Sequence, residues 1–221
     1  MQNYSTSEEN YIKAIYHLHT EGTVTTNELA AELNTRAASV TGMMKKLRDK
    51  QLVHYESYKG FRLTAEGKQL ALMIIRRHRL WEFFLAEKLR FNWDEVHAVA
   101  EEMEHVSSTK LIDKLDEFLG FPRYDPHGDP IPDAQGRIED PLQICLTDLP
   151  VNEQAFVCYV SDQSSEMLEV LGHKKISIGT AIEVKKKFSF DQSMEVRIRQ
   201  QPVTTISGDL AKNIFVKYEE S

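Results

Sequence analysis

The chain has few cysteines, no long apolar run and no excess of basic charge. Its 221 residues include two cysteines, Cys145 and Cys158, which lack the C-x-x-C spacing of a zinc or redox site. Two cysteines are too few for a disulfide framework, so we expect reduced thiols that pack like small apolar side chains. A single disulfide between them is the alternative.

Membrane and secretory classes are also disfavoured. No apolar run approaches the roughly 20 residues that span a bilayer, and the opening MQNYSTSEEN lacks the basic start and apolar core of a signal peptide. We therefore expect a cytoplasmic protein with no membrane partner. With 41% hydrophobic residues, the chain is long enough for one large domain or for two to three small ones.

The charge is unevenly distributed. The formal net charge of −7 argues against uniform binding to a polyanion. Residues 34–63, however, hold seven basic and two acidic side chains, whereas residues 94–117 hold eight acidic and two basic ones. The functions that need basic side chains and those that need acidic side chains are thus predicted in separate segments of the chain.

The N-terminal third predicts three helices and a hairpin. Residues 7–20 carry apolar side chains at helical spacing behind Ser7, the expected N-cap, and a short helix follows Thr25 or Thr26. Residues 36–50 then form an amphipathic helix whose polar face is basic and hydroxylated, and residues 52–64 alternate like a two-stranded hairpin. This order is typical of a winged helix-turn-helix, whose third helix enters the major groove of DNA.

A solvated surface face is the alternative for the basic helix alone, but the short helix before it and the hairpin after it favour DNA binding. Base contacts are predicted around the start of this helix, and phosphate contacts from its lysines and the hairpin. The predicted DNA-binding residues are Arg36, Ser39, Thr41, Lys45, Lys46, Lys59 and Arg62.

The rest of the chain predicts further helices and then strands. Three helices are expected over residues 65–90, 93–106 and 107–119, the last with an apolar stripe suited to a core or a dimer interface. Residues 120–141 hold five of the seven prolines and predict a linker. From about Leu146 onward, short β-rich runs indicate a small barrel, with one brief helix between the first two runs. The fold class is therefore mainly α with a small β domain.

Histidines and carboxylates recur at metal-ligand spacing. His97, Glu101, Glu104 and His105 lie at intervals that place all four on one face of a helix. On the preceding helix, His78 and Glu82 stand four residues apart in an apolar context, and the later DPHGDP supplies Asp125 and His127. Imidazoles and carboxylates without thiolate suit Mn²⁺ first and Fe²⁺ second. On spacing alone, an acidic helix that is merely solvated is the alternative.

Four stretches together resemble a known family. SEENYIKAIYHL, RRHRLWEFFL, VHAVAEEMEHVSS and DPHGDPIP are similar to motifs of the diphtheria toxin repressor family of metal-dependent transcriptional regulators. The resemblance covers essentially the whole chain and points to the manganese-responsive branch, since Glu101 stands where iron-responsive members have Cys. It implies a winged helix-turn-helix domain (1–64), a helical dimerisation and metal-binding domain with its linker (65–140) and an SH3-like domain (141–221).

The resemblance also implies two metal sites. The first comprises Glu101, Glu104 and His105 with a ligand from the first helix, where this chain has Asn10 in place of the usual Asp or Met. Either the Asn10 amide oxygen or the neighbouring Glu9 then supplies that ligand, or the site is weaker. The second site comprises His78, Glu82, His97, Asp125, His127 and, from the last domain, Asp162; an ordinary turn residue is the alternative for Asp162.

By resemblance, the function is repression of metal-uptake genes by a homodimer bound to a pseudo-palindromic operator, with Mn²⁺ or Fe²⁺ as co-repressor. A metal that bridges the first helix and the dimerisation domain would couple metal occupancy to DNA binding. Two other classes use the same features: a winged-helix repressor that senses a small organic ligand, and a dinuclear metallohydrolase or oxygenase. We expect a regulator without catalytic residues.

Overall fold

The computed structural model describes residues 4–18, 22–56, 59–138 and 143–218. Residues 19–20, 57–58 and 139–141, which fall within predicted elements, lie outside these ranges. The chain divides into two compact units. The first contains residues 1–81, 101–121 and 131–138, and the second contains residues 82–100, 122–130 and 139–221.

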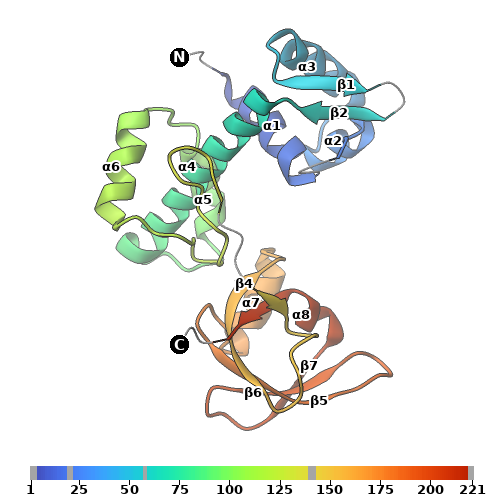
Figure 1. Cartoon of the computed structure of the whole chain (residues 1–221), viewed down its shortest axis with the longest axis vertical. Helices are drawn as coiled ribbons and strands as arrows, with labels where there is room; N and C mark the ends of the chain where they lie inside the picture. The colour runs from blue at the N-terminus through green and yellow to red at the C-terminus, as the bar shows by residue number, and fades with distance from the viewer. Residues whose placement is uncertain (1–3, 19–21, 57–58, 139–142, 219–221) are drawn as a thin grey trace. The chain divides into compact units, whose positions relative to one another are not determined.

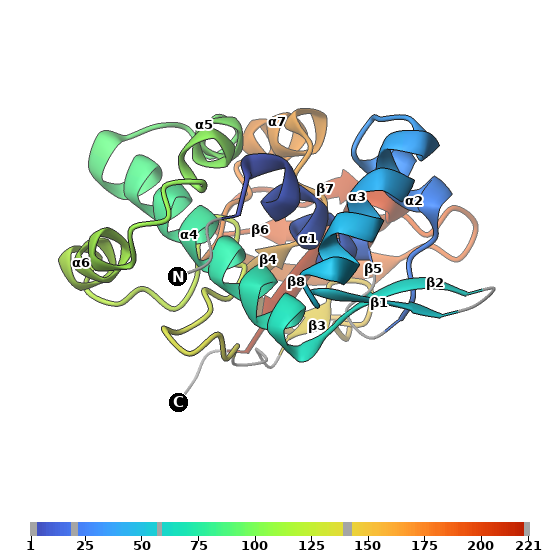
Figure 2. The ribbon, with the colours of Figure 1, turned by 90° about the horizontal axis from the view of Figure 1, so that it is seen from above.

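The first unit opens with three helices and a hairpin, in the predicted order (Figures 1 and 2). The hairpin is antiparallel, with Val53 opposite Leu63 and Glu56 opposite Gly60. The elements are α1 (Thr6–Leu18), α2 (Thr26–Glu32), α3 (Ala37–Asp49), β1 (Val53–Glu56) and β2 (Gly60–Leu63). A winged helix-turn-helix is therefore present.

Capping boxes set the starts of the first two helices. The Ser5 hydroxyl accepts the Glu8 N–H at 3.3 Å and the Glu8 carboxylate accepts the Ser5 N–H at 2.8 Å. The predicted N-cap Ser7 is wrong, since it lies inside the helix; Ser5, unlike Ser7, has a glutamate three residues later. The α2 cap is Thr25, which forms the same reciprocal pair with Glu28.

One apolar core holds these elements together. Val40, Met44 and Leu47 of α3 are buried against residues such as Ile12 and Leu29 of the two preceding helices. Burying three side chains on one stripe leaves the basic, hydroxylated face of α3 exposed.

The remaining helices are α4 (Ala65–Leu89), α5 (Val96–Met103) and α6 (Thr109–Leu119). Ser108 caps α6, whose Ile112, Leu115 and Leu119 are buried. On the same helix Leu111 and Phe118 are exposed, at 43% and 65%. Exposed large apolar side chains on one helix are typical of an association surface.

The second unit contains a six-stranded antiparallel sheet in the order β3-β8-β4-β5-β6-β7. Its core includes Val157, Val184, Val196 and Ile214. The elements are β3 (Ile144–Cys145), β4 (Gln154–Val160), α7 (Ser165–His173), β5 (Ala181–Lys187), β6 (Met194–Ile198), β7 (Thr204–Ile206), α8 (Gly208–Lys212) and β8 (Ile214–Lys217). The mainly α class with a small β domain is confirmed.

Two further predictions concern the cysteines and the membrane. Cys145 and Cys158 are free thiols, as expected, but both are half-buried rather than buried. Among the described helices, none combines the length and apolar character needed to cross a bilayer.

The Glu8 carboxylate joins α1 to α3 and predicts acid sensitivity. Burial alone raises its pKa, but hydrogen bonds from Lys50, the Ser5 backbone and Lys46 lower it to about 2. The Lys50 and Lys46 amino groups lie 2.6 and 3.3 Å from Glu8 Oε1. The folded pKa is below the unfolded value, so this stabilisation is present above about pH 4.5 and is lost as pH falls towards 2.

We expect the free energy of unfolding of the wild type to fall by about 1–2 kcal/mol more than that of Glu8→Gln between pH 5 and pH 3. Urea unfolding at both pH values measures this difference. Glu32→Gln, at an exposed position on α2, is the control and is expected to follow the wild type. Parallel pH profiles for Glu8→Gln and the wild type would contradict the role given to Glu8.

Candidate metal centre

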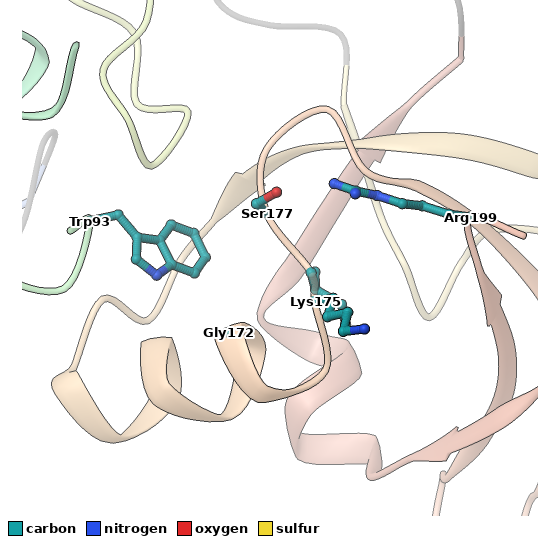
Figure 3. A pocket seen from close by; sticks show the side chains of 6 residues that line it. Trp93, Gly172, Lys175, Ser177 and Arg199 are labelled. Atoms are coloured by element: carbon teal, nitrogen blue, oxygen red, sulfur yellow. The ribbon is translucent and has the colours of Figure 1, made fainter. Parts of the chain in front are cut away.

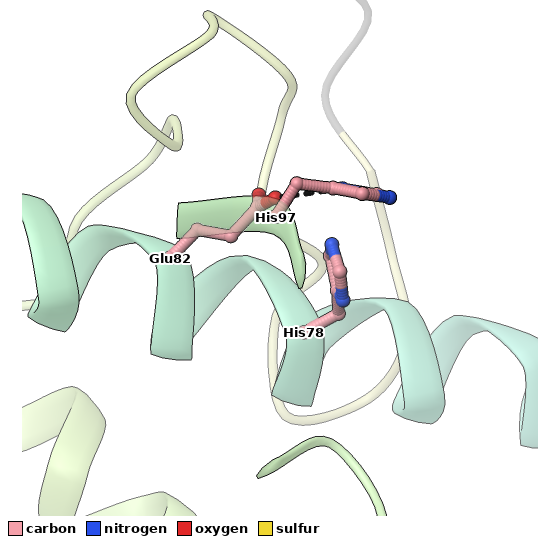
Figure 4. Close-up of side chains that lie close together, drawn as sticks. All are labelled: His78, Glu82 and His97. Carbon is pink, nitrogen blue, oxygen red and sulfur yellow. Dashed lines mark hydrogen bonds and ion pairs between the residues drawn. The ribbon is translucent and has the colours of Figure 1, made fainter. Parts of the chain in front are cut away.

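Glu82, on α4, is the residue around which the candidate ligands gather. It is buried, at 1% exposure, in a helix whose preceding turn carries His78. His97 of α5 places Nδ1 3.1 Å from Glu82 Oε1. Each of the three residues offers a ligand atom, and these atoms lie within 4.8 Å of one another (Figure 4). The predicted grouping of His78, Glu82 and His97 is thus present.

The loop from Asp125 to Asp129 brings a second group to the same carboxylate. Asp125 Oδ1 accepts the backbone N–H groups of His127 and Asp129 at 2.8 and 2.9 Å, which shapes the turn. Ligand atoms of Glu82, Asp125 and His127, all buried, lie within 4.8 Å of one another. Glu82 is therefore common to both groups.

Gly128 allows this loop to lie against β4. Its φ is +90°, and a Cβ atom there would stand 1.9 Å from the Cys158 carbonyl oxygen. The His127 carbonyl next to it accepts the Val160 N–H at 3.2 Å. Only glycine fits both the backbone angle and the close approach, so the position of His127 depends on Gly128.

The protonation of His127 is set by its neighbours. Nε2 lies 2.8 Å from the Trp93 carbonyl oxygen, which only accepts, so Nε2 carries a hydrogen. The other nitrogen, Nδ1, is buried without a hydrogen-bond partner and lies 3.8 Å from Glu82 Oε2 and 4.0 Å from Asp125 Oδ1. Burial lowers the pKa of His127, but Glu82, Asp125 and the Trp93 carbonyl raise it to about 9.

An imidazole nitrogen directed at two buried carboxylates is a place for a cation, either a proton or a metal ion. A metal ion held there by His127, Glu82 and Asp125 would displace the His127 proton, because imidazole binds metal through its neutral form. The donor set of carboxylate oxygens and imidazole nitrogens fits Mn²⁺ or Fe²⁺, and the Trp93 carbonyl orients the ring from behind. Sequence reasoning did not find Trp93, because a backbone carbonyl leaves no residue pattern.

The Trp93 side chain anchors this supporting group. It packs against the apolar core of the sheet domain, and its ring stacks with that of His127 at 6.1 Å between centroids. The indole lines a hollow of about 330 Å³ together with Lys175, Ser177 and Arg199. Figure 3 shows these lining side chains. The indole therefore fixes the carbonyl that holds His127.

Asp162 lies in the loop before α7. It is exposed, and its Oδ1 accepts the Ser164 N–H at 2.9 Å. Neither ligand group found among the described residues includes Asp162. Its neighbour Gln163 donates to Asp129, so the loop carrying Asp162 lies beside the Asp125 to Asp129 turn. A ligand role for Asp162 stays a prediction.

The predicted first site has a different arrangement. Glu101 and Glu104 both contact the amino group of Lys13 from α1. His105 Nδ1 lies 2.7 Å from Glu9 Oε2, and the half-buried Asn10 follows Glu9 on α1. Of the two candidates from α1, Glu9 is the one that reaches His105.

The predicted DNA-binding residues are exposed on α3 and the hairpin. Arg36 precedes the first turn of α3, and Thr41 donates to the Ala37 carbonyl at 3.0 Å. On the hairpin, the Lys59 and Arg62 side chains lie 3.6 and 2.8 Å from Glu56. The basic side chains are thus accessible for DNA binding on one domain, although two of them, Lys59 and Arg62, contact the acidic Glu56.

Known protein families match all three parts of the chain. Residues 3–61 match the N-terminal DNA-binding domain of iron-dependent repressors, residues 64–133 match their metal-binding and dimerisation domain, and residues 144–218 match the FeoA domain. One relative, the HTH-type transcriptional regulator MntR of Oceanobacillus iheyensis, is 32% identical over 67% of this chain and 96% of its own length.

The chain belongs to the iron-dependent repressor family. The diphtheria toxin repressor of Corynebacterium glutamicum is 30% identical over 80% of this chain and 82% of its own length. A solved manganese-dependent transcriptional repressor in complex with manganese covers 96% of this chain and 100% of its own, at 32% identity and a TM-score of 0.83.

Membership in the iron-dependent repressor family confirms the predicted resemblance, the fold class and the regulatory function. The chain is a metal-dependent, DNA-binding transcriptional repressor rather than an enzyme, so the metallohydrolase alternative is set aside. DNA and a second copy of the chain are the partners that these domains imply.

Proposed function

We propose that this repressor takes Mn²⁺, or Fe²⁺ as second choice, as its co-repressor and controls metal-uptake genes as a homodimer on a pseudo-palindromic operator. The carrying observation is His127 Nδ1, buried without a hydrogen-bond partner and directed at the carboxylates of Glu82 and Asp125. A buried ring nitrogen without a partner is costly, and either a proton on it that faces these carboxylates or a metal ion bound to its lone pair removes that cost.

The proposed ligands lie on Glu82, Asp125, His127 and the pair His78 and His97. Hard oxygens and imidazoles without thiolate favour Mn²⁺ or Fe²⁺, and the relatives of this chain include an iron-dependent and a manganese-dependent repressor. A bound ion would supply positive charge that holds Glu82 of α4 to the Asp125 to Asp129 turn. His127 is thus oriented by two neighbours, by the Glu82 carboxylate on the side of Nδ1 and by the Trp93 carbonyl on the side of Nε2.

Metal control follows from linkage. If the metal-bound form binds DNA more tightly, DNA strengthens metal binding by the same factor. On DNA, Arg36, Ser39 and Thr41 are proposed to reach base edges, while Lys45 and other basic side chains contact phosphates. A dimer with recognition helices about one DNA turn apart reads two inverted half-sites.

The test is DNA binding titrated with metal. A duplex is selected from a random pool with the full chain and Mn²⁺, and its affinity is then measured after chelation and after adding back Mn²⁺, Fe²⁺ or Zn²⁺. We expect at least about 10-fold tighter binding with Mn²⁺ or Fe²⁺, within the usual range of allosteric coupling. Affinity that does not respond to any of these ions would contradict metal control and favour the alternative of an organic effector.

A further inference from the structure

Lys13 of α1 occupies the centre of the carboxylate pair that the sequence assigns to the first metal site. Its Nζ lies 2.7 and 2.8 Å from the two oxygens of Glu104 and 3.2 Å from Glu101 Oε1. The Glu104 side chain is 1% exposed and that of Lys13 14%. A buried carboxylate requires a cation, and here the chain itself supplies one.

The other members of this cluster are also matched within the chain. Glu104 Oε2 lies 2.7 Å from His78 Nδ1, and His105 Nδ1 lies 2.7 Å from Glu9 Oε2. Glu9 Oε1 in turn accepts a 2.7 Å hydrogen bond from the Arg77 guanidinium. Two fixed cations, Lys13 and Arg77, therefore stand among the carboxylates that a divalent ion would need.

The sequence supports the same conclusion independently. Asn10 offers only a neutral amide, and Lys13 lies three residues later, on the same side of α1. This side of α1 therefore carries a positive charge and, at these two positions, no negative charge. Among the described residues, the groups with ligand atoms close enough to hold a metal contain Glu82 but neither Glu101 nor Glu104.

We propose that Lys13 is the resident cation of the Glu101–Glu104 pair, so that α1 is tied to this pair without a divalent ion and metal control is exerted at the Glu82 site alone. The claim that metal control is exerted at the Glu82 site rests on the proposed function. The residues of the first predicted site do not fit a divalent ion in this chain, because Lys13 and Arg77 already offset two of the three negative charges of Glu9, Glu101 and Glu104.

The first test counts Mn²⁺ bound per subunit at saturation by the full-length protein. Glu104→Gln is expected to bind as many ions as the wild type, whereas Glu82→Gln is expected to bind fewer. The double variant Asn10→Asp/Lys13→Met adds a carboxylate and removes the ammonium, so it is expected to gain one ion per subunit. Loss of one ion per subunit in Glu104→Gln would overturn the proposal.

The second test measures thermal unfolding after chelation, where no metal contributes. Lys13→Met leaves the buried Glu104 without its ammonium and is expected to lower the Tm by at least about 5 °C. Lys13→Arg keeps the charge and is expected to recover most of this loss. Lys68→Met, at an exposed position on α4, is the matched control. An unchanged Tm for metal-free Lys13→Met would overturn the role of Lys13 as resident cation.

The two tests separate this proposal from the proposed function. If the wild type bound no Mn²⁺ but Lys13→Met still melted early, metal control by Mn²⁺ would be wrong while the tie between Lys13 and Glu104 would stand. If metal-dependent DNA binding were present and Glu104→Gln lost an ion, metal control would stand and the assignment of Lys13 would be wrong.

Discussion

Glu82→Gln is expected to abolish the response of DNA binding to Mn²⁺. The variant keeps the size of the side chain but replaces a carboxylate by an amide, at the residue shared by both ligand groups. Loss of a residue that merely supports a ligand weakens metal binding about 10–100-fold, so loss of the shared carboxylate should cost at least as much. Mn²⁺ affinity by calorimetry and DNA affinity with and without Mn²⁺ measure the two effects.

Glu87→Gln provides the matched control, because Glu87 lies on the same helix at an exposed position. It removes the same charge from α4 and is expected to leave Mn²⁺ affinity within about 3-fold of the wild type, since exposed charges are well screened. The metal-free Glu82→Gln protein should still bind DNA as weakly as the chelated wild type. Mn²⁺ affinity that is equal in Glu82→Gln and Glu87→Gln would place the metal elsewhere.

Helical periodicity predicted most of the architecture. The spacing of His97, Glu101, Glu104 and His105 indicated one helical face, and α5 with the turn after it carries them. The predicted helix over residues 65–90 corresponds to α4, Ala65–Leu89. Such elements follow from local patterns. The 3.6-residue spacing of apolar side chains, the N-cap and the glycine that ends a helix can all be identified from neighbouring residues.

Which residues contact each other within the site was harder to predict. Spacing placed Glu104 and His105 on a ligand face, but it could not show that Lys13, 91 residues away from Glu104, supplies the opposing charge. The interval between Asn10 and Lys13 on α1 was the available signal. Likewise, the hydrogen bond from His127 to the Trp93 carbonyl depends on tertiary packing, which leaves no trace in composition or period.

Asp116→Ala is expected to be the most destabilising of the substitutions considered away from the metal centre. Arg76 of α4 is 2% exposed, and its Nη2 lies 2.6 Å from Asp116 Oδ2 on α6. The pKa of Asp116 is raised, because burial raises it by more than Arg76 lowers it. The Nε and Nη1 atoms of Arg76 are buried without a hydrogen-bond partner, so Asp116 provides most of the compensation for this charge.

Removing one partner of a buried ion pair typically costs about 3–5 kcal/mol, which corresponds to a Tm lower by roughly 10 °C for a chain of this size. Asp113→Ala is the control, because its carboxylate is 56% exposed and 4.0 Å from Arg76, and it should cost less than about 1 kcal/mol. The double variant Arg76→Met/Asp116→Leu removes both charges and should regain most of the lost stability. If Asp116→Ala melted no earlier than Asp113→Ala, the Arg76 charge would be compensated by other means.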